Sequence, residues 1–191
     1  MATASIEVFF DFVDPLSYLL ACELRASQLD GLPDIRWYGY EMRPPPTPLT
    51  TLDESSLASR WTLAREAEVA VGIAFGPPRL VPWTRKAHEL ALHAGANGVG
   101  DVVRDRIFEA YLLEGADIGR VDVLVRIARE AGLDETESKA VLDVDRFETE
   151  VLEHRSRAKA QALVDTPLLI ADTRHLQGFH NRTALGTFLH V

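Results

Sequence analysis

The chain has 191 residues, which suits one globular domain or one domain with a sizeable insertion. It is 47% apolar and 26% charged, and no stretch approaches the roughly 20 apolar residues that span a bilayer. The 29 Asp and Glu outnumber the 20 Lys and Arg, and the resulting net charge of −9 disfavours nucleic acid and anionic membranes as partners.

The cysteine and histidine residues limit the kinds of redox and metal site that the chain can form. A single cysteine, Cys22, excludes an intrachain disulfide, a CxxC redox pair and a multi-thiolate metal site. The six histidines include no pair at i and i+4, so we expect no metal centre. The first ten residues carry no basic region before their apolar run, which favours a cytoplasmic protein.

The first 42 residues predict a strand, a helix and a second strand. Residues 5–12 form an apolar and aromatic run of strand length. Asp14-Pro15 then places a capping carboxylate and a proline where a helix begins, and the apolar pattern continues to about Leu29. Residues 34–42 read as the second strand, so the unit predicts a parallel pair with a right-handed crossover.

A helical block and a closing hairpin follow. Prolines 44–46 and 48 make a stiff connector, after which the apolar periodicity is helical for about a hundred residues. We expect helices over residues 55–71, 83–94, 100–114, 121–131, 135–142 and 146–163. Strands at 168–171 and 175–179 and a short helix at 181–189 end the chain.

This element order predicts the α/β class, as a thioredoxin-like fold with an inserted all-helical domain. The boundaries predicted are residues 5–48 and 160–191 for the thioredoxin-like domain and 49–159 for the helical insertion.

The motifs resemble those of one superfamily. F-F-D-F-V-D-P-L-S-Y-L at residues 9–19 resembles the active-site segment of DsbA-like proteins, which carries C-P-x-C in the redox branch and S-P-x-S in the isomerase branch. Residues 83–88, 110–119 and 123–134 look like the helical block of the FrnE-type branch. V-D-T-P-L-L-I-A-D at residues 164–172 looks like the segment that holds the cis-proline of the superfamily.

The chain departs from this pattern at the expected active site. By the resemblance, the attacking cysteine or serine falls on Asp14 and the resolving position on Ser17. The cis-proline falls on Pro167, preceded by Thr166. Thiol–disulfide exchange requires a thiolate that attacks sulfur, and neither a carboxylate nor a hydroxyl can replace it. We therefore expect no dithiol oxidoreductase activity.

Asp14 and Ser17 are the candidate catalytic residues, each with a structural alternative. The positive end of the helix would keep Asp14 ionised where a thiolate would have been. Asp14 could equally serve only as an N-cap worth about 1 kcal/mol. The hydroxyl of Ser17 could hydrogen-bond to the capping Asp14, bind a substrate oxygen or face solvent. Without a neighbouring base it is a weak nucleophile.

Pro15, Thr166 and Pro167 are the candidate ligand-binding residues. A cis Thr166-Pro167 bond would free the Thr166 backbone to pair with an extended peptide or a glutathione-like small molecule, whereas a trans proline would only start a strand. Glutathione is a candidate cofactor, although an ionised Asp14 would repel its thiolate. Related proteins are often dimers, so a homodimer is a further expectation.

Three functions follow from these residues. The first is a redox-inactive protein that binds a peptide or small ligand beside Pro167. The second is a glutathione-dependent isomerase or transferase in which Asp14 or Ser17 moves a proton. The third is an oxidoreductase by family descent only.

Four aromatic residues could line a cleft between the two predicted domains, although aromatic residues at helical spacing more often lie in a core. They are Trp61, Trp83, Phe108 and Tyr111.

Overall fold

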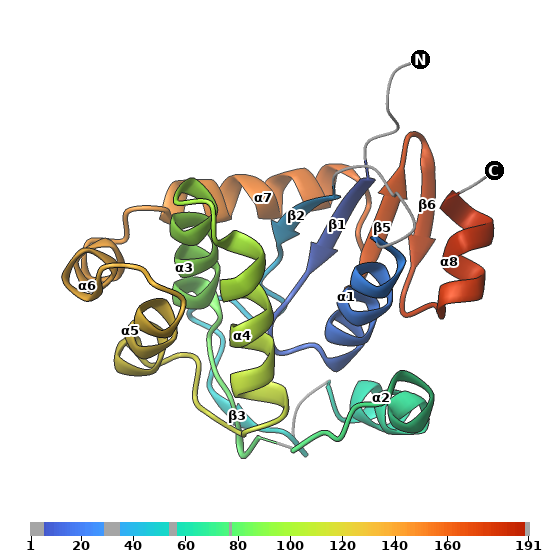
Figure 1. Ribbon diagram of the computed structural model, residues 1–191, viewed down its shortest axis with the longest axis horizontal. Helices are drawn as coiled ribbons and strands as arrows, with labels where there is room; N and C mark the ends of the chain where they lie inside the picture. Colours follow the sequence, from blue (N-terminus) through green and yellow to red (C-terminus); the bar gives the residue numbers. More distant parts are fainter. Residues whose placement is uncertain (1–5, 29–34, 54–56, 77, 190–191) are drawn as a thin grey trace.

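A four-stranded mixed sheet forms the centre of the molecule (Figure 1). The computed structural model describes residues 6–28, 35–53, 57–76 and 78–189. In spatial order the strands are β2 (Ile35–Gly39), β1 (Ile6–Phe10), β5 (Leu168–Ala171) and β6 (Arg174–Gln177). β1 is parallel to β2 and antiparallel to β5, which is antiparallel to β6. The α/β class and the parallel opening unit predicted from the sequence are confirmed.

Alternation of side chains along β1 gives the sheet two apolar faces. Ile6, Val8 and Phe10 join the main core on one face, where α1 (Pro15–Gln28) packs, while Phe9 lies on the other. Helix α7 (Glu148–Ala160) covers the Phe9 face and contacts β2. Helix α8 (Arg182–Leu189) packs beside α1 (Figure 1).

The middle of the chain is mainly helical, as expected. Its helices are α2 (Ala58–Val71), α3 (Arg85–Ala96), α4 (Gly100–Leu112), α5 (Val121–Glu130) and α6 (Glu135–Asp143). A two-strand pair, β3 (Thr50–Thr51) with β4 (Leu80–Val81), also lies in this region. The sequence did not predict this pair, because two residues are too few to show an alternating pattern.

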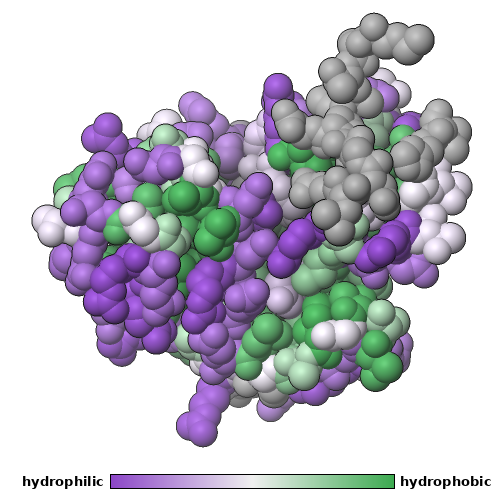
Figure 2. Space-filling model, viewed as in Figure 1, coloured by the Kyte–Doolittle hydropathy of each residue, from purple (hydrophilic) through white to green (hydrophobic). Residues whose placement is uncertain are grey.

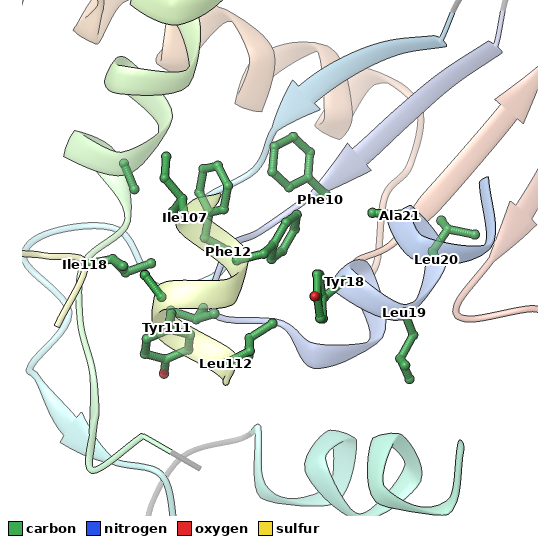
Figure 3. Close-up of a cluster of buried hydrophobic side chains, with 14 of the residues drawn as sticks. Phe10, Phe12, Tyr18, Leu19, Leu20, Ala21, Ile107, Tyr111, Leu112 and Ile118 are labelled. Carbon is green, nitrogen blue, oxygen red and sulfur yellow. The ribbon is translucent and has the colours of Figure 1, made fainter. Parts of the chain in front are cut away.

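One core joins the sheet to the helical block. Figure 3 shows Phe10 and Phe12 facing the side chains of α4. The rings of Phe10 and Phe12 lie 5.6 and 4.9 Å from that of Phe108, and Tyr18 of α1 lies 5.4 Å from it. Such aromatic pairs each contribute about 0.5–1.5 kcal/mol beyond their buried area. The inserted helices are therefore packed directly on the residues that lead into α1.

Several predicted element ends are wrong by a few residues. β1 ends at Phe10 because the carboxylate of Asp11 accepts the Met42 N–H at 2.8 Å, so the chain turns there. α7 ends at Ala160, and Ala162 has a left-handed φ of 55° that a helix cannot continue through. The predicted start of the second helix at residue 55 and the predicted end of the first at Leu29 lie outside the described residues.

Figure 2 shows a mostly hydrophilic face with a hydrophobic area over α2. Leu63 and Val69 of α2 are exposed apolar residues, at 55% and 93%. No helix within the described ranges is long and apolar enough to cross a membrane.

Candidate functional site

The tip of α1 is built by a short turn after β1. Asp14 precedes Pro15, whose fixed φ suits the first helical position. The Asp14 carboxylate accepts the backbone N–H of Leu16 and that of Ser17, both at 3.1 Å. Asp14 is therefore an N-cap, which was one of the two roles the sequence left open.

Asp14 is also the centre of a buried polar network, and its exposed fraction is 0%. Ser17 Oγ donates to Asp14 Oδ2 at 2.5 Å, and Thr166 Oγ1 donates to the same oxygen at 2.9 Å. Arg60 donates through Nε to Oδ1 and through Nη2 to Oδ2, both at 2.9 Å. The two candidate catalytic residues and Thr166, which lies in the segment before β5, are thus brought together in one network.

Arg60 of α2 links this network to the far end of the chain. Its Nη1 donates to Asp165, and its Nη2 donates to the Thr166 carbonyl as well as to Asp14. The Thr166 N–H donates to Asp165 Oδ1 at 2.9 Å. The sequence alone did not point to Arg60 and Asp165, because an arginine within a helix and an aspartate in a loop carry no local signal.

The charges of this network are coupled. Burial raises the pKa of the Asp14 carboxyl, and Arg60, Ser17 and Thr166 oppose that rise. Burial lowers the pKa of Arg60, but Asp14 and Asp165 outweigh it and raise the pKa overall. The helix terminus favours the ionised form of Asp14, as expected from the sequence, whereas burial acts in the opposite direction and Arg60 supplies the compensating charge.

The candidate ligand-binding residues are covered in this structure. The Thr166-Pro167 peptide bond is cis. Pro15, Thr166 and Pro167 are all buried, as are Asp14 and Ser17. Both backbone groups of Thr166 already have partners in Arg60 and Asp165. The Thr166 backbone, which was expected to be free to pair with a ligand, is therefore not accessible here, because Arg60 of α2 binds its carbonyl and Asp165 binds its N–H.

The lone thiol lies apart from this network. Cys22 is half-buried on α1, two turns beyond Asp14. Burial raises its pKa to about 11, so it is a thiol and not a thiolate at neutral pH. Cys22 lies eight residues beyond Asp14, away from the position at which the resemblance puts the attacking cysteine.

Three of the four aromatic residues considered for a cleft belong to the core. Trp61, Phe108 and Tyr111 are at most 3% exposed, whereas Trp83 is 39% exposed and donates its indole N–H to the Thr47 carbonyl at 2.8 Å. Burial of these three large rings removes apolar area from water and so stabilises the fold.

Known structures share this fold. A probable DsbA oxidoreductase from Streptomyces coelicolor superposes with a TM-score of 0.85 at 18% identity, over 97% of this chain and 88% of that one. A 2-hydroxychromene-2-carboxylate isomerase gives 0.77 at 17%, over 96% and 92%. The cytosolic disulfide reductase DsbM from Pseudomonas aeruginosa, in a structure with GSH, gives 0.72 at 20%, over 98% and 100%.

Sequence comparison agrees. The uncharacterized protein YwbO of Bacillus subtilis (strain 168) is 26% identical over 150 residues, which are 76% of this chain and 75% of that protein. The model of the DSBA-like thioredoxin domain matches residues 5–188. The chain therefore belongs to the DSBA-like thioredoxin domain family.

Proposed function

We propose that this DsbA-family protein does not catalyse thiol–disulfide exchange and instead binds a small-molecule or peptide ligand at the α1 tip beside Pro167. The observation that carries the proposal is the buried Asp14, paired with Arg60 at the position where the resemblance puts the attacking cysteine. Disulfide exchange needs a thiolate, and the one thiol of the chain is the protonated Cys22.

The ligand class follows from the partners of Arg60. Two carboxylates hold its guanidinium, and they differ in burial: the Asp14 side chain is 0% exposed and that of Asp165 is 42% exposed. A ligand carboxylate can replace Asp165 on Arg60 without uncovering Asp14. When the ligand displaces Asp165, the Thr166 N–H, which now donates to Asp165, also becomes free to donate to an extended ligand backbone. We therefore infer that the ligand carries a carboxylate.

Glutathione chemistry is the second candidate, because glutathione has two carboxylates that suit Arg60. In that case Asp14 or Ser17 would serve in proton transfer, as in an isomerase or transferase of the FrnE-related branches. The hydroxyl of Ser17 donates to Asp14 at 2.5 Å, which is the contact that a carboxylate base and a hydroxyl would share. The negative charge of Asp14 beside a bound thiolate argues against it.

Two measurements test the proposal. Insulin reduction by dithiothreitol should proceed no faster with the protein than without it. Restoring the motif with Asp14→Cys together with Ser17→Cys should produce catalysis, because Arg60 would stabilise a thiolate at residue 14. Catalysis by the unaltered protein would refute the proposal.

Ligand binding is tested by calorimetry with glutathione and with a short peptide that has a free C-terminal carboxylate. The control ligand is the same peptide with an amidated terminus. We expect the free acid to bind and the amide to bind at least about tenfold more weakly, because it cannot form the ion pair with Arg60. Equal binding of acid and amide, or no binding by either peptide or glutathione, would refute the carboxylate assignment.

A further inference from the structure

β2 is an outer strand of the sheet, and a cavity of about 430 Å³ lies between it and helices α3, α4 and α7 (Figure 1). Trp37 and Gly39 of β2 both line this cavity. None of the residues of the α1-tip network lines it, so the cavity is separate from the ligand site proposed at that helix. Its volume lies within the range of ligand sites.

The backbone groups of Trp37 and Gly39 point away from β1. In a parallel pair, alternate residues of a strand bond to the neighbouring strand. The Tyr40 N–H donates to the Phe10 carbonyl at 2.7 Å, and Phe10 lies opposite Gly39 in the register. Tyr38 therefore also bonds to β1, whereas the N–H and C=O groups of Trp37 and Gly39 face the free edge of the sheet.

These outward groups have no protein partner. Among the described residues, no backbone or side-chain group is hydrogen-bonded to them at the free edge. Gly39 is buried, and a buried backbone group without a partner costs free energy comparable to a lost hydrogen bond. Trp37 and Gly39 each offer a donor and an acceptor, about 7 Å apart along the strand. An extended peptide presents its own groups at the same interval, so its backbone complements this edge.

The α3 wall of the cavity is built from small residues that leave room beside the edge. Ala91 and Gly95 of α3 and Gly100 at the start of α4 line it. A side chain added at Gly95 would meet no atom within 4 Å, so open space lies next to this helical position. The cavity therefore offers an apolar surface to the side chains on one face of an added strand.

The surface on the other face of β2 is acidic. Tyr38 lines a second hollow there, together with Glu150 and Glu153 of α7. Both carboxylates are exposed, and neither forms an ion pair with any described residue. Arg157 also lines this hollow but is already paired with a carboxylate of β1, and Arg146 can offset only one of the two glutamates. The uncompensated charge is therefore negative and favours a basic side chain.

The two hollows meet at α7. Phe147, Glu150 and His154 line both, so successive side chains of one strand can enter them in turn. Burial lowers the pKa of His154 to about 4, so this imidazole adds no positive charge at neutral pH. Arg104 covers the Trp37 ring at 4.0 Å and is paired with two aspartates of α4. The backbone of Trp37, and not its ring, is therefore the group that can bind a ligand.

We propose that an extended peptide segment adds to the free edge of β2 as a fifth strand of the sheet. Its backbone pairs with the N–H and C=O groups of Trp37 and Gly39. An apolar side chain lies against α3, and the neighbouring basic side chain lies on the opposite face beside Glu150 and Glu153.

The probe is the pentapeptide acetyl-Val-Lys-Val-Lys-Val-amide, which has no carboxylate to bind Arg60. Calorimetry should show saturation at one site with a dissociation constant below about 1 mM. Hydrogen exchange followed by NMR reports where it binds. The peptide should slow exchange of the Trp37 amide at least about tenfold more than that of Tyr38, which is already bonded to β1. No saturation, or equal slowing at the two amides, overturns the proposal.

Modified probes separate backbone pairing from side-chain contacts. Successive residues of a strand present their N–H groups to opposite edges, so N-methylation at the third residue and at the second and fourth residues should differ. One of these two peptides should bind like the parent, and the other at least about tenfold more weakly. If both or neither lose binding, strand addition is refuted. Replacement of both lysines by glutamine should weaken binding about two- to fivefold, and equal binding refutes the role of the glutamates.

Two variants locate the binding. Gly95→Leu fills the space beside the edge with a better helix former, so it should abolish peptide binding without lowering the melting temperature. Gly186→Leu in α8 is the matched control, since a side chain there also meets no atom within 4 Å, and it should bind the peptide normally. Unchanged binding by Gly95→Leu rules out this cavity as the site.

Discussion

Replacement of Arg60 by methionine is the sharpest test of the buried network at the tip of α1. Methionine keeps an unbranched side chain in α2 but removes the charge and every hydrogen bond to Asp14, Asp165 and Thr166. Asp14, which is 0% exposed, is then left without a cation. Removal of one partner from a buried ion pair costs about 3–5 kcal/mol, and protonation of Asp14 can relieve part of that. We expect the free energy of unfolding to fall by about 3 kcal/mol at pH 7.

A double-mutant cycle separates this pairing from lost packing. Asn caps a helix about as well as Asp does, so the stability lost in Asp14→Asn reports mainly on the removed charge. If the pair is the source of the stability, the double variant should be more stable than the sum of the two single losses predicts, by about 1–3 kcal/mol. Additivity within about 0.5 kcal/mol would refute the reasoning.

The measurement is equilibrium urea unfolding followed by circular dichroism, with the melting temperature as a second readout. A loss of 3 kcal/mol corresponds to a fall of about 6–12 °C for a chain of this size. Arg25→Met is the matched control. Arg25 pairs with Asp105 at 3.3 Å, but its side chain is 48% exposed, so its loss should cost less than about 1 kcal/mol. Equal effects of the two arginine variants would show that burial of the Asp14 pair carries no special weight.

Three further predictions concern other parts of the molecule. Gly39→Ala should lower the free energy of unfolding by about 1–3 kcal/mol, because its Cβ would meet the His88 ring, and thermal melting would measure it. Burial lowers the pKa of His154 to about 4, so the unfolded chain binds that proton first and stability falls as the pH drops from about 6.5 to 4. His154→Gln should reduce this loss by about 1–2 kcal/mol, measured by urea unfolding at pH 7 and at pH 4.5. An equal change in the free energy of unfolding between the two pH values for both proteins would contradict it. Asp134→Ala should cost about 1 kcal/mol, because the Asp134 carboxylate caps α6 by accepting the Glu137 N–H at 2.7 Å.

The architecture around the site could be predicted because its signals are local. Asp14-Pro15 marks a helix start through contacts that reach only three residues along the chain. The apolar run of β1 and the proline before β5 likewise mark strands from their own residues. The absence of a second thiol is fixed by composition and needs no structure.

What closes the site depends on tertiary packing. Arg60 and Asp14 are 46 residues apart, and Asp14 and Thr166 are 152 apart, so no spacing rule links them. The same holds for the buried contact between Asp11 and His88, which are 77 residues apart. The sequence by itself determined where α1 begins, and it determined that no cysteine stands at the start of that helix. Only the docking of α2 across α1 decided that an arginine would neutralise and cover it, because a long-range ion pair depends on how helices pack and leaves no periodic trace in the chain.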